Sequence, residues 1–215
     1  MKVQKKLFGI LLMVCTLQMT AQERESLPES LLTLKPVEVF NSDKAIATNL
    51  ADGRADVPHS ALKVKENIQG LPLYEVEVFQ ATKSHYGVTI HWKSTASVKK
   101  GDVMLARLSM RTISARQESG ESNLFFYFQQ AKAPHEKSFI STLSTGNQWK
   151  TFDIPFIANR DMTAGEASVG LGFGALAQKV EITGVQILNF SNKVTLDKLP
   201  VTRFTYAGRD PNAVW

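Results

Sequence analysis

The stretch VMLARLSMR, residues 103–111, decides the fold because its apolar and polar side chains alternate. In a β-strand, successive side chains point to opposite faces, so residues two apart share a face. The even-numbered residues are all apolar and predict the core side of a sheet. Arg107 and Arg111 have the other parity and are expected on the open face of that sheet. The apolar set is Met104, Ala106, Leu108 and Met110.

Comparable runs recur along the chain, rich in Val, Ile, Phe and Tyr and separated by Gly, Pro, Asn and Ser. This pattern is typical of antiparallel strands. No stretch beyond the first 21 residues sustains a helical period, although one helical turn is expected near residues 27–34. Eight to ten strands without helices predict an all-β fold, either a sandwich or a barrel. The runs cover residues 74–78, 88–92, 103–111, 124–130, 149–154, 169–173 and 180–190.

The run LFFYFQQ, residues 124–130, adds a candidate binding surface. Phe126 and Phe128 fit the core parity, so the residues beside them face the other way. Aromatic rings pack against the C–H groups of a sugar ring, while guanidinium and amide groups hydrogen-bond its hydroxyls. The two strands together therefore predict a sugar-binding face. The predicted ligand contacts are Arg107, Arg111, Phe125, Tyr127 and Gln129.

A glycine-rich run at residues 168–174 supports this interpretation, because Gly170, Gly172 and Gly174 leave one strand face almost without side chains. Such a strip predicts the floor of a groove, where a ligand or another backbone comes close. A competing interpretation gives the exposed arginines and tyrosines only a role in solubility and cross-strand packing. The four aromatic residues 125–128 can also be buried on both faces.

Residues 1–21 are predicted to be a secretory signal peptide. Three early lysines precede an apolar run at residues 7–17, which is shorter than the about 20 residues of a membrane span. Ala21 supplies the small residue at the cut. We expect a secreted protein, extracellular or periplasmic, with no membrane association after cleavage. Cleavage also removes Cys15, the one cysteine, so no disulfide is expected.

The charge balance gives no argument for a nucleic-acid partner. The chain has 25 Lys and Arg against 20 Asp and Glu, and removing the three signal-peptide lysines leaves 22 against 20, a net charge of +2. Along the rest of the chain, we predict a flexible arm at residues 22–33 and one β-sandwich domain at 34–193. Residues 194–215 are predicted to be a linker towards a downstream domain.

Enzyme signatures are missing from the sequence. There is no G-x-S-x-G elbow, phosphate-binding loop or H-E-x-x-H motif. Glu75 and Glu77 could meet the spacing of glycosidase carboxylates, but alternating acids on a solvent-facing strand are the more usual explanation. His85 and His91 flank one strand and form a conceivable metal pair, although exposed surface histidines are far commoner. We therefore predict no catalytic residue.

Several phrases from Gly101 onward resemble the carbohydrate-binding modules that precede some bacterial glycoside hydrolase family ten xylanases. They comprise residues 100–103, 126–128, 149–152, 154–156 and 165–167, and the most specific is the tail TYAGRDPNAVW, residues 205–215. The resemblance spans roughly residues 70–215. It implies a jelly-roll sandwich of two antiparallel sheets, galactose-binding-domain-like, with β-glycan in its cleft and sometimes a structural calcium ion. The catalytic barrel is missing from these residues, so no hydrolase activity is carried over.

We therefore expect a secreted, non-catalytic carbohydrate-binding module that binds xylan-like β-glycan and targets an attached xylanase. One alternative is a structural or interaction sandwich that packs on a neighbouring domain and has no glycan site. A third hypothesis is a glycosidase in its own right. A concave open sheet face that exposes its aromatic residues favours the first hypothesis, and burial of that face by loops or a second domain counts against it.

Overall fold

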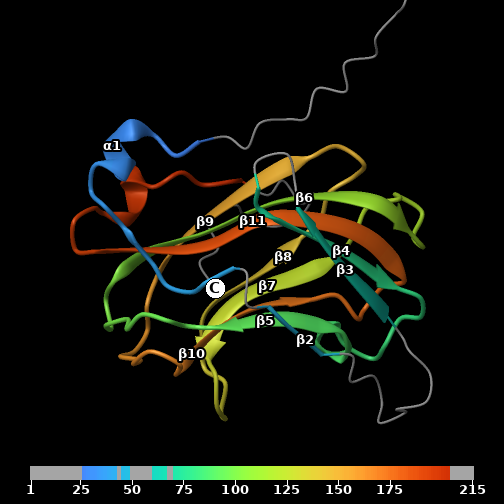
Figure 1. Cartoon of the computed structure of the whole chain (residues 1–215), viewed down its shortest axis with the longest axis horizontal. Helices are drawn as coiled ribbons and strands as arrows, with labels where there is room; N and C mark the ends of the chain where they lie inside the picture. The colour runs from blue at the N-terminus through green and yellow to red at the C-terminus, as the bar shows by residue number, and fades with distance from the viewer. Residues whose placement is uncertain (1–25, 43–44, 49–59, 67–69, 204–215) are drawn as a thin grey trace, which may run out of the picture.

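The computed structural model describes residues 26–42, 45–48, 60–66 and 70–203. Within these ranges the chain forms two antiparallel sheets packed face to face, which confirms the predicted all-β sandwich (Figure 1). The predicted signal peptide and the end of the predicted linker, residues 204–215, lie outside the described residues. No helix in the described ranges is long and apolar enough to cross a membrane.

The two sheets are built from strands that are distant in the sequence. The six-stranded sheet has the order β3 (Ser60–Glu66), β4 (Pro72–Val78), β11 (Gln178–Ser191), β6 (Val103–Ala115) and β9 (Lys150–Ile157), with β1 (Val37–Glu38) also paired to β11. The five-stranded sheet has the order β2 (Ile46–Thr48), β5 (Thr89–Lys93), β10 (Ala167–Gly172), β7 (Leu124–Gln130) and β8 (Lys137–Leu143). Short helical turns are α1 (Glu29–Leu32), η1 (His85–Gly87) and η2 (Leu196–Lys198).

The core lies between the two sheets and confirms the predicted parity of both decisive strands. Met104 and Leu108 of β6 and Phe126 and Phe128 of β7 are fully buried in one apolar cluster. Trp92 of β5 belongs to the same cluster, and its indole Nε1 donates a hydrogen bond of 3.0 Å to a backbone carbonyl. Burying each such side chain stabilises the fold by about 1.5–3 kcal/mol.

The segments before and after the sandwich pack on the outer face of the six-stranded sheet. Leu31 of α1 and Leu199, which follows η2, are buried in a second apolar cluster that includes Leu105 of β6. Figure 1 shows α1 beside the red end of the described chain. The predicted arm and linker are therefore wrong for residues 26–33 and 194–203, because leucines there bury apolar surface. The expected helical turn is confirmed by α1.

Candidate functional site

The predicted site residues are divided between the two sheets. Arg107 and Arg111 lie on β6 in the six-stranded sheet, whereas β7, which carries the aromatic residues and Gln129, belongs to the five-stranded sheet. The core separates the two groups, so the prediction of one shared face is wrong. Alternation along a strand determines which side chains face the core, but it does not determine which sheet the strand joins.

Arg107 forms a buried ion pair with Asp153. Its Nε donates to Asp153 Oδ1 at 2.7 Å and its Nη2 donates to Asp153 Oδ2 at 3.2 Å. The arginine side chain is only 3% exposed. Thr202 contacts this pair, because its hydroxyl accepts a hydrogen bond of 2.9 Å from the Asp153 backbone amide. Arg107 is therefore a structural residue and not a ligand contact.

Arg111 also contacts neighbouring side chains, Glu181 and Trp149. Its Nε donates to Glu181 Oε2 at 2.7 Å, and its guanidinium lies 5.1 Å from the ring centroid of Trp149. Nearby, Glu75 is in contact with three lysines. Hydrogen bonds from Lys65 and then Lys179 lower the pKa of the Glu75 carboxyl to about 2. The outer face of the six-stranded sheet thus carries mutually paired charges.

The outer face of the five-stranded sheet does bring the other three predicted residues together. Strand β10 lies between β7 and β5. Its Gly170 is paired with Tyr127 of β7 on one side and with His91 of β5 on the other. Gly172 lies opposite Phe125, and Ser168 lies opposite Gln129. The small residues of β10 therefore separate the aromatic residues of β7 from β5.

Tyr86 of η1 is the residue of this face that the sequence analysis missed. Its ring makes edge-on contacts with Phe125 and Tyr127, at centroid distances of 5.9 and 5.7 Å. The adjacent His85 ring stacks on Phe125 at 3.6 Å. Tyr86 is 42% exposed, whereas Tyr127 beneath it is 4% exposed. The most exposed ring of this aromatic cluster therefore belongs to η1, whereas Phe125 of β7 is only half-buried and Tyr127 is buried.

The glycine strip is covered by other parts of this chain. A Cβ on Gly170 would lie 2.2 Å from Tyr127 Cζ, and one on Gly172 would lie 2.9 Å from the His85 carbonyl oxygen. Gly174 is approached in the same way by Thr82. Of the two predicted reasons for the glycines, close approach by another segment of the chain is the one observed. The strip allows Tyr127 and the η1 segment to lie flat on β10.

Tyr127 carries a buried hydroxyl with no hydrogen-bond partner among the described residues. Burial, and secondarily the neighbouring Tyr86, raises the pKa of Tyr127 to about 12. The hydroxyl is therefore neutral at physiological pH and can both donate and accept a hydrogen bond. An unpaired buried hydroxyl costs about 1–3 kcal/mol, which a ligand hydroxyl could recover.

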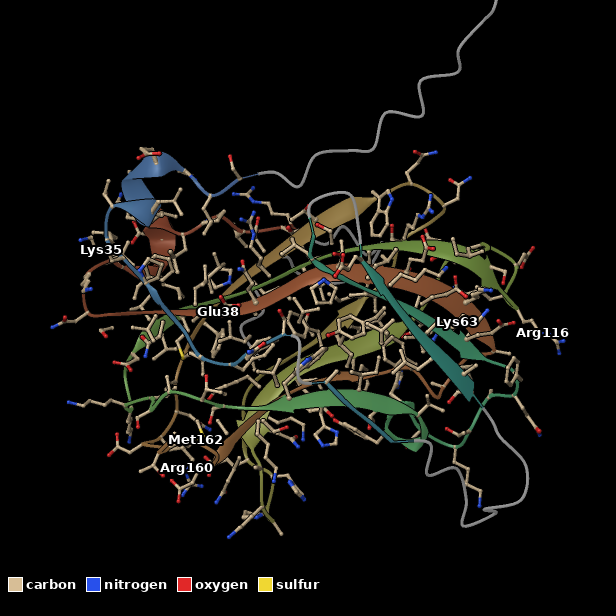
Figure 2. All side chains as sticks on the ribbon, viewed as in Figure 1. Lys35, Glu38, Lys63, Arg116, Arg160 and Met162 are labelled. Atoms are coloured by element: carbon tan, nitrogen blue, oxygen red, sulfur yellow. The ribbon has the colours of Figure 1, made fainter. Side chains whose placement is uncertain are left out.

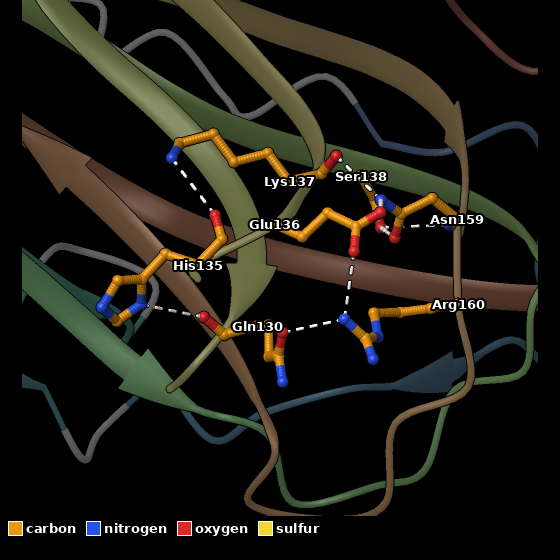
Figure 3. A network of polar contacts seen from close by, with 7 residues as sticks. All are labelled: Gln130, His135, Glu136, Lys137, Ser138, Asn159 and Arg160. Atoms are coloured by element: carbon orange, nitrogen blue, oxygen red, sulfur yellow. Dashed lines mark hydrogen bonds and ion pairs between the residues drawn. The ribbon is translucent and has the colours of Figure 1, made fainter. Parts of the chain in front are cut away.

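One end of the face is held by a polar network between the β7–β8 hairpin and the segment after β9 (Figure 3). Arg160 Nη1 donates to Gln130 Oε1 at 2.8 Å and to Glu136 Oε2 at 3.0 Å. Asn159 Nδ2 donates to the other Glu136 oxygen at 3.0 Å. A pocket of about 320 Å³ adjoins this network. Its lining comprises Gln130, Lys132, Arg160, Asp161, Met162, Ala164, Gly165 and Glu166.

A calcium site finds no support in the side chains that the structure describes. They contain no group of three or more His, Cys, Asp or Glu residues that could hold a metal ion. His85 instead stacks on Phe125, and its Nε2 lies 2.9 Å from Asn123 Oδ1.

Comparison with known proteins identifies the fold. No protein-family model matches the chain, and no curated protein matches it. A solved structure described as "CBM4 structure and function" has a TM-score of 0.51 at 12% identity, covering 69% of this chain and 88% of that chain. This likeness confirms the fold that the sequence resemblance implies.

Two further solved structures are similar at lower scores. BiXyn10A CBM1 has a TM-score of 0.48 at 16% identity, covering 71% of this chain and 96% of that chain. The CBM22-1 xylan-binding domain of Paenibacillus barcinonensis Xyn10C has a TM-score of 0.45 at 9% identity, covering 72% of this chain and 94% of that chain.

Proposed function

We propose that this chain is a non-catalytic carbohydrate-binding module whose site is the outer face of the five-stranded sheet. The observation that carries the proposal is the exposed Tyr86 ring, supported from below by Phe125 and Tyr127. An aromatic ring that is fixed by two others presents a flat apolar surface with little conformational entropy to lose on binding. This is the surface that the C–H side of a pyranose ring requires.

Polar groups of the same face supply the hydrogen bonds that orient a sugar. The Gln129 amide offers two donors and an acceptor, and it stands one row away from Tyr127 on β7. The unpaired Tyr127 hydroxyl adds a further donor and acceptor. The proposed contacts are therefore Tyr86 for stacking, Tyr127 and Gln129 for hydrogen bonding, and Phe125 as support. Arg107 and Arg111 are not among them, because both are paired on the opposite face.

The glycan that we propose is xylan-like β-glycan, and the proposed role is to target an attached xylanase after secretion. These finer assignments rest on the sequence resemblance across roughly residues 70–215 and on the predicted signal peptide. A glycosidase is disfavoured, because the general acid of such an enzyme has a raised pKa. The pKa of Glu75 is shifted the opposite way, to about 2, by its lysine partners.

Titration calorimetry of the full chain with soluble xylan tests the proposal. Tyr86→Ala should weaken binding by about 1–2 kcal/mol, or roughly fivefold to thirtyfold, because it removes the stacking surface. Phe79→Ala is the matched control, since Phe79 follows β4 of the other sheet and is 47% exposed. Equal affinity of the wild type and Tyr86→Ala would contradict the proposed site. No binding of any β-glycan by the wild type would favour the interaction-domain alternative.

A further inference from the structure

The two outer faces of the sandwich differ in how their cations are neutralised. On the outer face of the six-stranded sheet, five basic residues form ion pairs with carboxylates. These are Lys63, Lys65, Arg107, Arg111 and Lys179. The five strands of the other sheet contain no Asp or Glu at all. Lys93 of β5, Lys137 of β8 and Lys132 in the preceding hairpin form no ion pair with any residue that the structure describes.

Two of these unpaired lysines lie at opposite ends of one row across the candidate face. Lys93 is opposite Ser168, Ser168 is opposite Gln129, and Gln129 is opposite Lys137. Three strand spacings separate the ends of this row, which is a distance of about 14 Å. Burial, and then Lys93, lowers the pKa of His91 of β5, so its imidazole adds little positive charge to this row at pH 7.

Lys137 is held against the aromatic surface and does not simply extend into solvent. Its Nζ lies 5.4 Å from the centroid of the Tyr86 ring, and it donates a hydrogen bond of 3.4 Å to the His135 carbonyl oxygen. Figure 3 shows Lys137 reaching back over His135 at the hairpin. A sugar stacked on Tyr86 would therefore have an ammonium group within reach of its substituents.

We infer that the glycan bound on this face carries carboxylate groups, that is, uronic acid units. This inference rests on the proposed function, since it describes the ligand of the same site. Unpaired cations beside an acid-free surface attract an anionic ligand and orient it. These lysines are few, and Glu136 and Glu166 in nearby loops limit the positive field. The surface thus suits a chain with sparse carboxylates better than a densely charged polyanion such as a nucleic acid.

The test compares one polysaccharide in two forms, glucuronic-acid-bearing xylan before and after chemical reduction of its carboxyl groups. The backbone is the same in both, so the ratio of the two affinities isolates the carboxylate. For the full-length wild type, native glucuronoxylan should bind at least about threefold more tightly than the reduced form. The preference should shrink as salt is added, because these lysines are exposed.

The double variant Lys93→Gln/Lys137→Gln should lose this preference while still binding the reduced xylan. Lys63→Gln is the matched control and should keep the preference. Figure 2 shows Lys63 at the right of the molecule, away from Arg160 and Met162 beside the pocket. Neither the double variant nor the Lys63→Gln control should change the melting temperature by more than about 2 °C, because the substituted side chains are at the surface.

The outcomes separate this inference from the proposed function. Equal binding of native and reduced xylan by the wild type overturns the inference and leaves the proposed function standing. A preference that survives in Lys93→Gln/Lys137→Gln also overturns it. Binding of duplex DNA as tightly as glucuronoxylan would show general attraction to polyanions and would equally overturn it. Absence of binding to both forms of xylan would remove the proposed function together with the inference.

Discussion

Gly170 of β10 lies directly against the Tyr127 ring, and its replacement by alanine tests how the candidate face is built. An ideal Cβ on Gly170 would lie 2.2 Å from Tyr127 Cζ and 2.3 Å from the hydroxyl oxygen. Non-bonded heavy atoms prefer a separation of about 3.5–4.0 Å, so the ring has to move by more than about 1 Å. The movement is opposed by Tyr86, whose ring centroid is 5.7 Å from that of Tyr127.

We expect Gly170→Ala to destabilise the protein by about 1–3 kcal/mol, the usual effect of an extra methyl group in a well-packed site. A domain of this size loses about 2–4 °C in Tm per kcal/mol, so the Tm should fall by about 2–12 °C. Xylan affinity should fall as well, because the displaced Tyr127 ring shifts the stacking surface of Tyr86. Thermal melts and calorimetric titrations of the full chain measure the two effects separately.

Two controls make this prediction refutable. Gly146→Ala should be nearly neutral, because no atom lies within 4 Å of the position that its Cβ would take. In a Tyr127→Ala background, Gly170→Ala should cost less than about 0.5 kcal/mol, since the clashing ring is gone. If Gly170→Ala destabilises both backgrounds equally, contact with Tyr127 is not the reason for glycine at this position.

Three further predictions concern the scaffold. Leu108→Ala should lower the free energy of unfolding by about 2–5 kcal/mol in a urea titration, because Leu108 is fully buried, yet it should leave xylan affinity unchanged. Asp153→Ala should lower it by about 3–5 kcal/mol, because the Arg107 guanidinium is left buried without its carboxylate; a loss below about 1 kcal/mol would contradict this role. The pKa of Glu75 is lowered from 4.5 to about 2, so its stabilising contribution is fully present above pH 4.5 and is lost as the pH falls towards 2. Glu75→Gln should therefore lower the Tm more at neutral pH than near pH 2, and an equal loss at both would refute the assignment.

The alternation in β6 and β7 was sufficient to predict which side chains form the core. Leu108 and Phe126 are buried, and Arg107 and Tyr127 face away from the core, as the sequence predicted. The pairing of the strands could not be predicted in the same way. β6 and β7 are consecutive in the chain but belong to different sheets, and pairing depends on contacts between residues far apart in the sequence. The predicted five-residue site was therefore divided between two faces.

The residues that the sequence analysis misjudged all depend on distant partners. The carboxylate that pairs with Arg107 is 46 residues away, and the one that pairs with Arg111 is 70 residues away. Tyr86 lies in a loop, where no periodic pattern indicates which way a side chain points. The one available signal was an aromatic pair, His85 and Tyr86, immediately before a glycine in a polar loop. That signal is too common to identify a binding residue without the position of η1 over β7.

Chemical-shift mapping by ¹H–¹⁵N NMR, with a soluble xylo-oligosaccharide added to the full chain, tests the central claim most directly. We expect the largest shifts at Tyr86 and its loop neighbours and at the Gln129 side-chain amide, with smaller ones at Lys137. We expect no shift at Arg111 or elsewhere on the outer face of the six-stranded sheet. Shifts confined to β6, β4 and β11, or the same small changes on both faces, would contradict a glycan site on the five-stranded sheet.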